Sequence, residues 1–365
     1  MKITGFRFAR LRVPLKTPFK SAIRTVEAID DIVVMIDTDD GHVGYGSGSP
    51  TPKITGDTSG SLLAAVREHI APALIGLDVE DLNLLTSRTQ RAIRRNFTAK
   101  GAVECGLHDL FGQRYGAATY RLLGGGEPAL TTSLTISVDY IDKMVADAVE
   151  AVDRGFEAIK IVVGKDPGVD MERVKAIHAA LSGRAVLRLD AGYGWTPKET
   201  VRVVRQLEEA GVRLDTLEHP TRTWDLAGMR FVAERVETPV VAGIGDGGVP
   251  AALEVIRNRA ADVISFSLLG AGGITPALRI CDLATEHGME SMLGCFLEGP
   301  ISVAAAAHLG VARADVITRV DLDTPFLARS NPVSSNVRFA NAEITIEDEP
   351  GLGIAEIAGL EPIAD

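Results

Sequence analysis

Residues 158–190 read AIKIVVGKDPGVDMERVKAIHAALSGRAVLRLD, and this stretch decides the fold. Two apolar runs, Ala158 to Val163 and Ala185 to Leu189, have the length and β-branched content of buried strands. Between them, Met171 to Leu181 has the apolar spacing of an amphipathic helix. A strand, a helix and a second strand in this order predict a repeated β/α unit.

The same rhythm continues over most of the chain from Thr131 onward. Eight apolar runs recur, most of them separated by amphipathic stretches: Leu134 to Val138, Ala158 to Val163, Ala185 to Leu189, Leu214 to Leu217, Pro239 to Ala242, Asp262 to Phe266, Ser291 to Leu293 and Val316 to Val320. Eight such units predict an α/β fold, a (β/α) barrel of the TIM type. An open doubly wound sheet is the alternative.

The first part of the chain has a different pattern. Ile3 to Val13 alternates like a strand, Asp31 to Ile36 is β-branched, and helical spacing follows as far as Tyr115. Gly124 to Gly126 then interrupts the pattern. We therefore expect a capping α+β domain over residues 1–126, a barrel over 127–323, and a tail over 324–365, with a strand at Glu343 to Ile346, that packs back on the cap.

Composition restricts the class of partner. The 365 residues include 38 Lys plus Arg and 49 Asp plus Glu, a formal net charge of -11, which excludes a basic nucleic-acid platform. No run of apolar residues is long enough to span a membrane, and the N-terminus does not resemble a signal peptide. Three cysteines without a CxxC pair suit a reducing cytoplasm. We expect a cytoplasmic protein with a small-molecule substrate; self-association into a homo-oligomer stays open.

In such a barrel, functional side chains follow the carboxyl ends of the strands. The polar or otherwise notable residues at these ends are Lys160, Asp190, Glu218, Gly243, Ser267, Cys295 with Glu298, and Asp321 with Asp323. Asp190 and Glu218 could together hold a divalent cation, or each could pair with a Lys or Arg. Asp321 and Asp323 share one face of a strand and suit an ammonium group, or else a turn before Pro325.

Two further features lie near this mouth. His219 directly follows Glu218. Residues 243–248 match GxGxxG, which favours a flexible loop or an anion-binding backbone nest over a dinucleotide site, because the match lies outside a first β/α unit. The absence of HExxH and GxSxG removes support for zinc-protease and α/β-hydrolase chemistry.

On several motifs the chain resembles the enolase superfamily, in the muconate-lactonizing subgroup, and most of all the dipeptide epimerases of the L-Ala-D/L-Glu type. The similarity covers nearly the whole length. The motifs that carry it are Thr17 to Lys20, Asp39 to Gly46, Pro52 to Thr58, Phe156 to Gly164, Asp190 to Trp195, Glu218 to Pro220, Gly272 to Ile274, Gly294 to Glu298 and Asp321 to Asp323.

The resemblance implies an enolase-like barrel with its cap, and a reaction. Members hold Mg²⁺ on three strand-end carboxylates, and two opposed lysines exchange the α-proton of a substrate carboxylate. Asp321 and Asp323 would bind the substrate's α-ammonium group, and Arg24, in the capping loop, an acidic side chain. Cys295 and Glu298 complete the implied substrate-binding set.

This chain departs from that pattern at the reacting centre. Val162 and Ser267 occupy the two lysine positions, so Lys160 remains as the candidate catalytic lysine. Gly243 occupies the third metal-ligand position, although Asp246 could join Asp190 and Glu218 as a substitute. Ser47 replaces a glutamate common in the family. We therefore expect a weakened or absent Mg²⁺ site.

Two functions follow. One is a diverged enzyme (an isomerase, lyase or cyclase) that acts on an amino-acid- or peptide-like substrate with an α-ammonium group, with ordinary two-lysine racemisation lost. Its acid and base would come from Lys160, His219, Asp246, Glu298 and Cys295. The alternative is a non-catalytic small-molecule-binding pseudoenzyme.

Overall fold

The computed structural model describes residues 1–21 and 24–364. Its larger sheet has eight strands in chain order, and each neighbouring pair is parallel. The strands are β5 (Leu134–Ile136), β6 (Ala158–Val162), β7 (Val186–Asp190), β8 (Leu214–Glu218), β9 (Val240–Gly243), β10 (Val263–Ser267), β11 (Glu290–Gly294) and β12 (Ile317–Asp321). The predicted runs match them to within about two residues at either end. The predicted (β/α) barrel is confirmed, and the open-sheet alternative is wrong.

The first and last strands of this sheet meet along a seam. Ser133 N donates to Val320 O at 3.1 Å, which joins the two strand regions through the backbone. Side chains complete the closure, because Leu322 N donates to Thr132 Oγ1 at 2.9 Å and Thr135 N donates to Asp323 Oδ2 at 2.8 Å. The barrel is therefore closed at β5 and β12 partly by polar side chains.

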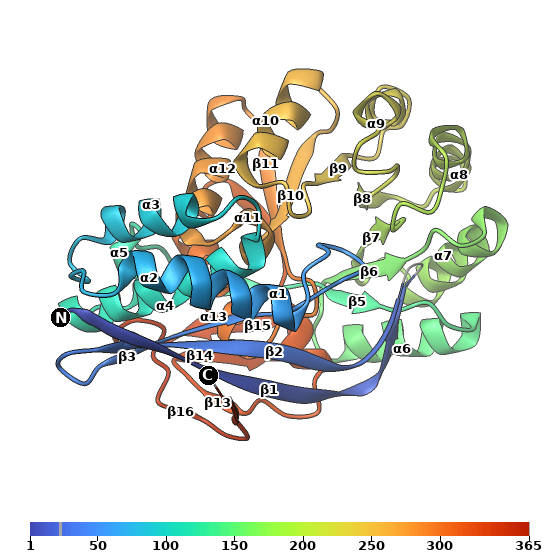
Figure 1. Cartoon of the computed structure of the whole chain (residues 1–365). Helices are drawn as coiled ribbons and strands as arrows, with labels where there is room; N and C mark the ends of the chain where they lie inside the picture. Colours follow the sequence, from blue (N-terminus) through green and yellow to red (C-terminus); the bar gives the residue numbers. More distant parts are fainter. Residues whose placement is uncertain (22–23, 365) are drawn as a thin grey trace.

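Helices surround the strands on the outside, as Figure 1 shows. They are α6 (Ile141–Asp153), α7 (Pro167–Leu181), α8 (Pro197–Glu209), α9 (Leu226–Ala233), α10 (Gly248–Asn258), α12 (Ile274–Glu286) and α13 (Pro300–Ala312). Local signals set their starts: at α8, Glu199 N donates to Thr196 Oγ1 and Thr196 N to Glu199 Oε2, a capping box followed by Pro197. Helix α13 is buried at nearly every position because it lies between the barrel and the cap, where an all-round apolar sequence is needed.

An antiparallel sheet of order β17-β1-β2-β3 forms the floor of the cap. Its strands are β1 (Ile3–Lys20), β2 (Thr25–Thr38), β3 (Val43–Gly48) and β17 (Glu361–Ile363). Strand β1 is longer than the run predicted to end at Val13, because it continues past a bulge near Pro14 into a long hairpin with β2. Strand β17 pairs with β1, so the C-terminal end returns to the N-terminal sheet.

Helices cover one face of this sheet (Figure 1). They are α1 (Ser59–Ala64), the π-helical η1 (Ala65–Ile70), α2 (Ala71–Leu74), α3 (Leu82–Ala92), α4 (Phe97–Tyr115) and α5 (Thr119–Leu122). Helix α4 packs directly on β3 at Gly46, where a Cβ atom would lie 1.8 Å from Ala102 O. Only glycine permits this approach, which brings α4 directly onto the cap sheet.

Short elements complete the chain. The strands are β4 (Ala129–Thr131), β13 (Val333–Ser334), β14 (Val337–Ala340), β15 (Glu343–Ile346) and β16 (Glu356–Ile357), and the helices are α11 (Leu268–Ala271) and α14 (Thr324–Leu327). The predicted strand at Glu343 to Ile346 is confirmed as β15. Within residues 1–21 and 24–364, no helix combines the length and apolarity needed to cross a membrane.

The long β1–β2 hairpin reaches the mouth of the barrel. Val138 N donates to Lys20 O at 3.1 Å, and Lys20 Nζ lies 2.8 Å from Asp139 Oδ2. Arg24 Nη2 donates to Phe296 O at 2.9 Å, in the loop after β11. The cap therefore covers the carboxyl ends of the strands, where the candidate site lies.

Candidate active site

A cavity of about 120 Å³ lies between the hairpin and the barrel mouth. Strand ends form its floor with Lys160 and Val162 of β6, Asp190 of β7, and Asp321 with Asp323 at the end of β12. The cap contributes Arg24, among others, and His219 lies at one side. The structure thus brings together most of the residues predicted from the strand ends, as expected if parallel strands all end at one edge.

Lys160 links two of the carboxylates. Its Nζ lies 2.9 Å from Asp321 Oδ2 and 3.3 Å from Glu218 Oε2, and all three side chains are nearly buried. Burial alone would lower the pKa of Lys160, but the charges of Asp321 and Glu218 raise this pKa well above its ordinary value. The amine is therefore held as an ammonium group, which can stabilise negative charge but is poorly suited to proton transfer in either direction near neutral pH.

Asp321 has two further partners. Arg188 Nη1 donates to its Oδ1 at 2.9 Å, and Ser133 Oγ donates to the same oxygen. Burial would raise the pKa of Asp321, but Lys160 and Arg188 lower it to about 2. Both oxygens of this carboxylate are thus already bonded within the protein.

Asp323 differs from Asp321. Its Oδ2 accepts from Thr135 N at 2.8 Å, and it lines the cavity. Burial raises its pKa, although the charge of Lys160 opposes the shift. Of the two aspartates predicted to bind an ammonium group, Asp323 is the one that the protein's own cations satisfy less fully.

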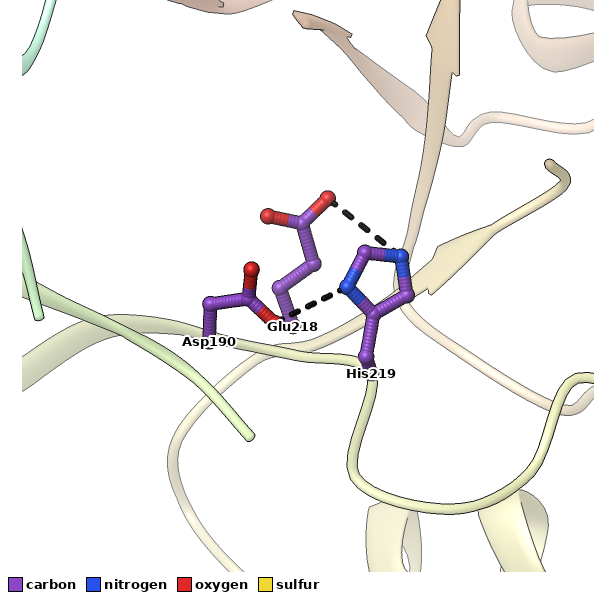
Figure 2. A group of neighbouring side chains, drawn as sticks. All are labelled: Asp190, Glu218 and His219. Atoms are coloured by element: carbon purple, nitrogen blue, oxygen red, sulfur yellow. Dashed lines mark hydrogen bonds and ion pairs between the residues drawn. The ribbon is translucent and has the colours of Figure 1, made fainter. Parts of the chain in front are cut away.

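Asp190, Glu218 and His219 form a compact group on the other side of the mouth (Figure 2). One ligand atom from each lies within 4.8 Å of the others. His219 Nδ1 is 3.0 Å from Asp190 Oδ1, and Nε2 is 3.8 Å from Glu218 Oε1. Burial would lower the pKa of His219, but the charges of Glu218 and Asp190 raise it. Burial would raise the pKa of Asp190, but the charges of His219 and Lys160 lower it.

An uncommon backbone conformation places the imidazole in this group. His219 has φ +51° and Tyr193 has φ +63°, both in the left-handed region that non-glycine residues seldom adopt. The two rings pack with centroids 4.5 Å apart. Such conformations persist only where surrounding contacts hold them, and they are concentrated at functional sites.

The third metal-ligand position of the family pattern holds Gly243 at the end of β9. A Cβ atom on Gly243 would lie 2.1 Å from His219 Nε2, so the imidazole fills the space where another side chain would begin. Asp246, the predicted substitute, is outside the group of donors that the described residues form; it lines a neighbouring cavity of about 540 Å³. The residues present therefore do not make a three-carboxylate Mg²⁺ site.

Neither lysine position carries an ionisable group. Val162 lines the cavity and is 2% exposed. Ser267 is buried, and its Oγ accepts from Gly270 N at 2.9 Å, which caps the short helix α11. The serine hydroxyl thus has a structural partner.

The remaining predicted residues lie in different places. Arg24 lines the cavity, and burial lowers its pKa to about 10. Cys295 also lines it, but burial raises the pKa of its thiol to about 12, so it carries no thiolate near neutral pH. Glu298 is 1% exposed and does not line this cavity; it lines a smaller one with Val13 and Ile29. Burial, and next the charge of Asp31, raise its pKa to about 8.

Several site residues were not identified from the sequence. Arg188 lies in β7 two positions before Asp190, so strand alternation places both on the inner face of the barrel. Strand alternation is therefore a signal from which Arg188 could be predicted. Ser265 also follows from alternation before Ser267, and its Oγ donates to Glu218 Oε1 at 2.8 Å. Asp31 of β2 lies beneath Glu298 and accepts from Ser47 Oγ and Gly299 N; no sequence pattern connects these segments.

Comparison with known proteins agrees with this architecture. Residues 3–124 match the mandelate racemase / muconate lactonizing enzyme N-terminal domain family, and residues 143–356 match the enolase C-terminal domain-like family. The chain therefore belongs to the enolase superfamily, in its muconate-lactonizing subgroup.

Within that subgroup the chain is similar to several dipeptide epimerases. It is 42% identical over 98% of its length, and 99% of the relative's, to an L-Ala-D/L-Glu epimerase of Clostridium acetobutylicum. A substrate-liganded L-Ala-D/L-Glu epimerase from Bacillus subtilis superposes with a TM-score of 0.95 at 36% identity, covering 98% and 100% of the two chains. A dipeptide epimerase from Enterococcus faecalis, complexed with Mg and L-Leu-L-Tyr, gives a TM-score of 0.92 at 34% identity, covering 98% and 100%.

Proposed function

We propose that this chain acts on an amino-acid- or dipeptide-like substrate with an α-ammonium group, and that it does not carry out ordinary two-lysine racemisation. The cavity under the hairpin is the substrate site. Asp323 would receive the ammonium group, because its pKa is raised and a cation would stabilise the charged carboxylate. Arg24 supplies a cation from the cap for an anionic group of the substrate.

The observation that carries this proposal is the chemistry of the two lysine positions. Removal of an α-proton needs a base with a suitable pKa within hydrogen-bond reach of the substrate. Val162 has no such group, and the Ser267 hydroxyl is occupied in capping α11. Lys160 does not replace them, because its ammonium group is paired with Asp321 and Glu218.

A narrower set of reactions suits the groups that remain. The Lys160 ammonium group can stabilise negative charge that develops beside it. An elimination or a ring closure that needs a fixed positive charge, and no lysine base, fits this site better than a racemisation that needs two opposed bases.

The direct test is exchange of the substrate α-proton in deuterated water, followed by NMR with L-Ala-L-Glu and other dipeptides. The Bacillus subtilis epimerase serves as positive control under the same conditions. We expect no deuterium at the α-carbon with this chain. Incorporation at a rate comparable to that of the control would refute the loss of racemisation.

A binding measurement tests the substrate class separately. Saturable binding of free dipeptides, together with much weaker binding of the same dipeptides acetylated at the amino group, is expected if Asp323 receives the ammonium group. Equal binding of both forms would contradict the proposal. Binding without conversion by the assays for elimination or ring closure would favour the pseudoenzyme, for which the saturation of Asp321 by Lys160, Arg188 and Ser133 is the supporting observation.

A further inference from the structure

The barrel mouth carries a set of metal donors that differs from the family's three carboxylates. We propose that Asp190, Glu218 and His219 form a mixed nitrogen and oxygen centre that binds a divalent transition-metal ion in preference to Mg²⁺. Its third donor comes from the residue after Glu218 on β8, and not from the end of β9. The inference concerns the metal alone and does not depend on the substrate proposed above.

The geometry of the three side chains supports a common ligand. Donor atoms that each bind one ion at about 2.0–2.2 Å lie roughly 3–4 Å from one another. One nitrogen of His219 and one oxygen from each carboxylate lie within 4.8 Å of one another in the metal-free arrangement, close to that spacing. Neighbouring groups hold both carboxylates in place: Gly192 N donates to Asp190 Oδ1 at 2.9 Å, and Ser265 Oγ to Glu218 Oε1 at 2.8 Å. Hydrogen bonds of this kind orient metal ligands.

The space at Gly243 connects this centre to the missing carboxylate. Because a Cβ atom on residue 243 would lie 2.1 Å from His219 Nε2, an imidazole in this position and a longer side chain at residue 243 exclude each other. The absence of a side chain at Gly243 and the placement of the imidazole after β8 are thus sterically coupled.

The donor types determine the metal. Mg²⁺ prefers oxygen ligands in octahedral geometry, whereas imidazole nitrogen suits Zn²⁺, Co²⁺, Ni²⁺ and Fe²⁺. With a neutral imidazole, the two carboxylates balance the charge of a divalent ion. His219 Nδ1 and Asp190 Oδ1 lie within hydrogen-bond distance in the metal-free arrangement, and both groups must be deprotonated to bind an ion. Lys160 contacts the other oxygen of Glu218, Oε2, and its shorter ion pair is with Asp321, so it does not occupy the same place.

Metal binding to the full chain tests this centre without any activity assay. After treatment with a chelator, the protein is titrated with Zn²⁺, Co²⁺ and Mg²⁺ by calorimetry, and the Co²⁺ absorption spectrum is recorded. We expect one site with an affinity for Zn²⁺ at least about tenfold higher than for Mg²⁺. Tighter binding of Mg²⁺ than of Zn²⁺, or no stoichiometric binding of any of the three ions, would overturn the proposal.

His219→Asn is the critical variant, because asparagine tolerates the left-handed backbone at this position better than most residues. It should weaken Zn²⁺ binding by about 100-fold and change the Co²⁺ spectrum. His42→Asn is the matched control, since His42 also pairs with a carboxylate, Asp40, at 3.1 Å but lies on the surface. Unchanged Zn²⁺ affinity in His219→Asn, or an equal loss in His42→Asn, would show that the imidazole is not a ligand.

A double variant tests the exclusion between the two positions. His219→Asn with Gly243→Asp removes the imidazole and returns a carboxylate to β9. We expect the preference to reverse toward Mg²⁺, by at least about tenfold relative to the unmodified chain. A preference for Zn²⁺ equal to that of the unmodified chain would refute the assignment of His219 as the donor that selects the metal. A thermal unfolding curve for each variant establishes that it is folded.

Discussion

Lys160 on β6 and Asp321 on β12 form a nearly buried ion pair, in which Nζ lies 2.9 Å from Oδ2. The same ammonium group contacts Glu218, and the same carboxylate contacts Arg188. The charges at the floor of the cavity therefore form a connected network, and the removal of one member leaves the others buried without their counter-charge.

A double-mutant cycle measures that connection. Lys160→Met and Asp321→Asn should each lower the free energy of unfolding by about 3–5 kcal/mol, because each leaves a buried charge unpaired. The double variant should be less destabilised than the sum by about 0.5–3 kcal/mol. Denaturant unfolding provides the values. Strict additivity would show that the two groups do not interact energetically.

Asp323→Asn should separate ligand binding from stability. The amide oxygen can still accept from Thr135 N, so we expect the free energy of unfolding to change by less than about 1 kcal/mol. The affinity for a dipeptide with a free amino group should fall by about 2–5 kcal/mol, since the variant lacks the charge that faces the ammonium group. The acetylated dipeptide is the control ligand. An equal change for both ligands would place the ammonium group elsewhere.

Stability should fall as the pH rises through the neutral range, with Glu298 as one cause. Its pKa is raised from 4.5 to about 8, so the folded protein keeps a proton that the unfolded chain has already lost. This contribution is fully present below the unfolded pKa and is lost as the pH rises toward 8. The expected decrease is about 2–5 kcal/mol.

Glu298→Gln, which mimics the protonated acid, should remove that part of the decrease. The stability of the variant relative to the unmodified protein should therefore increase as the pH rises from about 5 to about 8. Glu104 and Asp31, whose pKa values burial raises to about 7 and about 6, contribute in the same direction in both proteins. Glu172→Gln controls for the loss of a surface charge. A difference in stability that is constant across this range would contradict the assignment.

Gly243→Ala tests how tightly the imidazole is packed. The added Cβ atom would lie 2.1 Å from His219 Nε2, so the ring must move, at an expected loss of about 1–3 kcal/mol in stability. In the His219→Asn background the shorter side chain should accommodate the methyl group, and the loss should largely disappear. The comparison needs four unfolding curves. The same loss in both backgrounds would mean that another contact at residue 243 is responsible.

The sequence predicted the barrel well because its strands have a simple physical signature. Short β-branched runs alternate with amphipathic helices, and the carboxylates at the strand ends, Asp190 and Glu218, interrupt otherwise apolar segments. Their place at the mouth then follows from the parallel direction of the strands. Lys160 is predicted by the same reasoning, as are Asp321 and Asp323.

The partners of these groups could not be predicted from the sequence in the same way. The position of the His219 ring depends on a left-handed backbone angle at a residue that gives no local sign of it. Glu298 was expected to face the substrate, but the loop after β11 turns, with Leu297 at φ +60°, and the carboxyl lies beside Asp31 of the cap. Both outcomes arise from contacts between segments distant in sequence, which periodicity and spacing do not report.

The seam between β5 and β12 links the cavity to the closure of the barrel. Part of that closure is the hydrogen bond from Thr135 N to Asp323 Oδ2, and Asp323 also faces the cavity. A ligand that immobilises this carboxylate would also immobilise the acceptor of the Thr135 amide. Local opening of the barrel, measured as hydrogen exchange at that amide, would then slow whenever the cavity is occupied. Binding of a small molecule and closure of the barrel would thus depend on the same side chain.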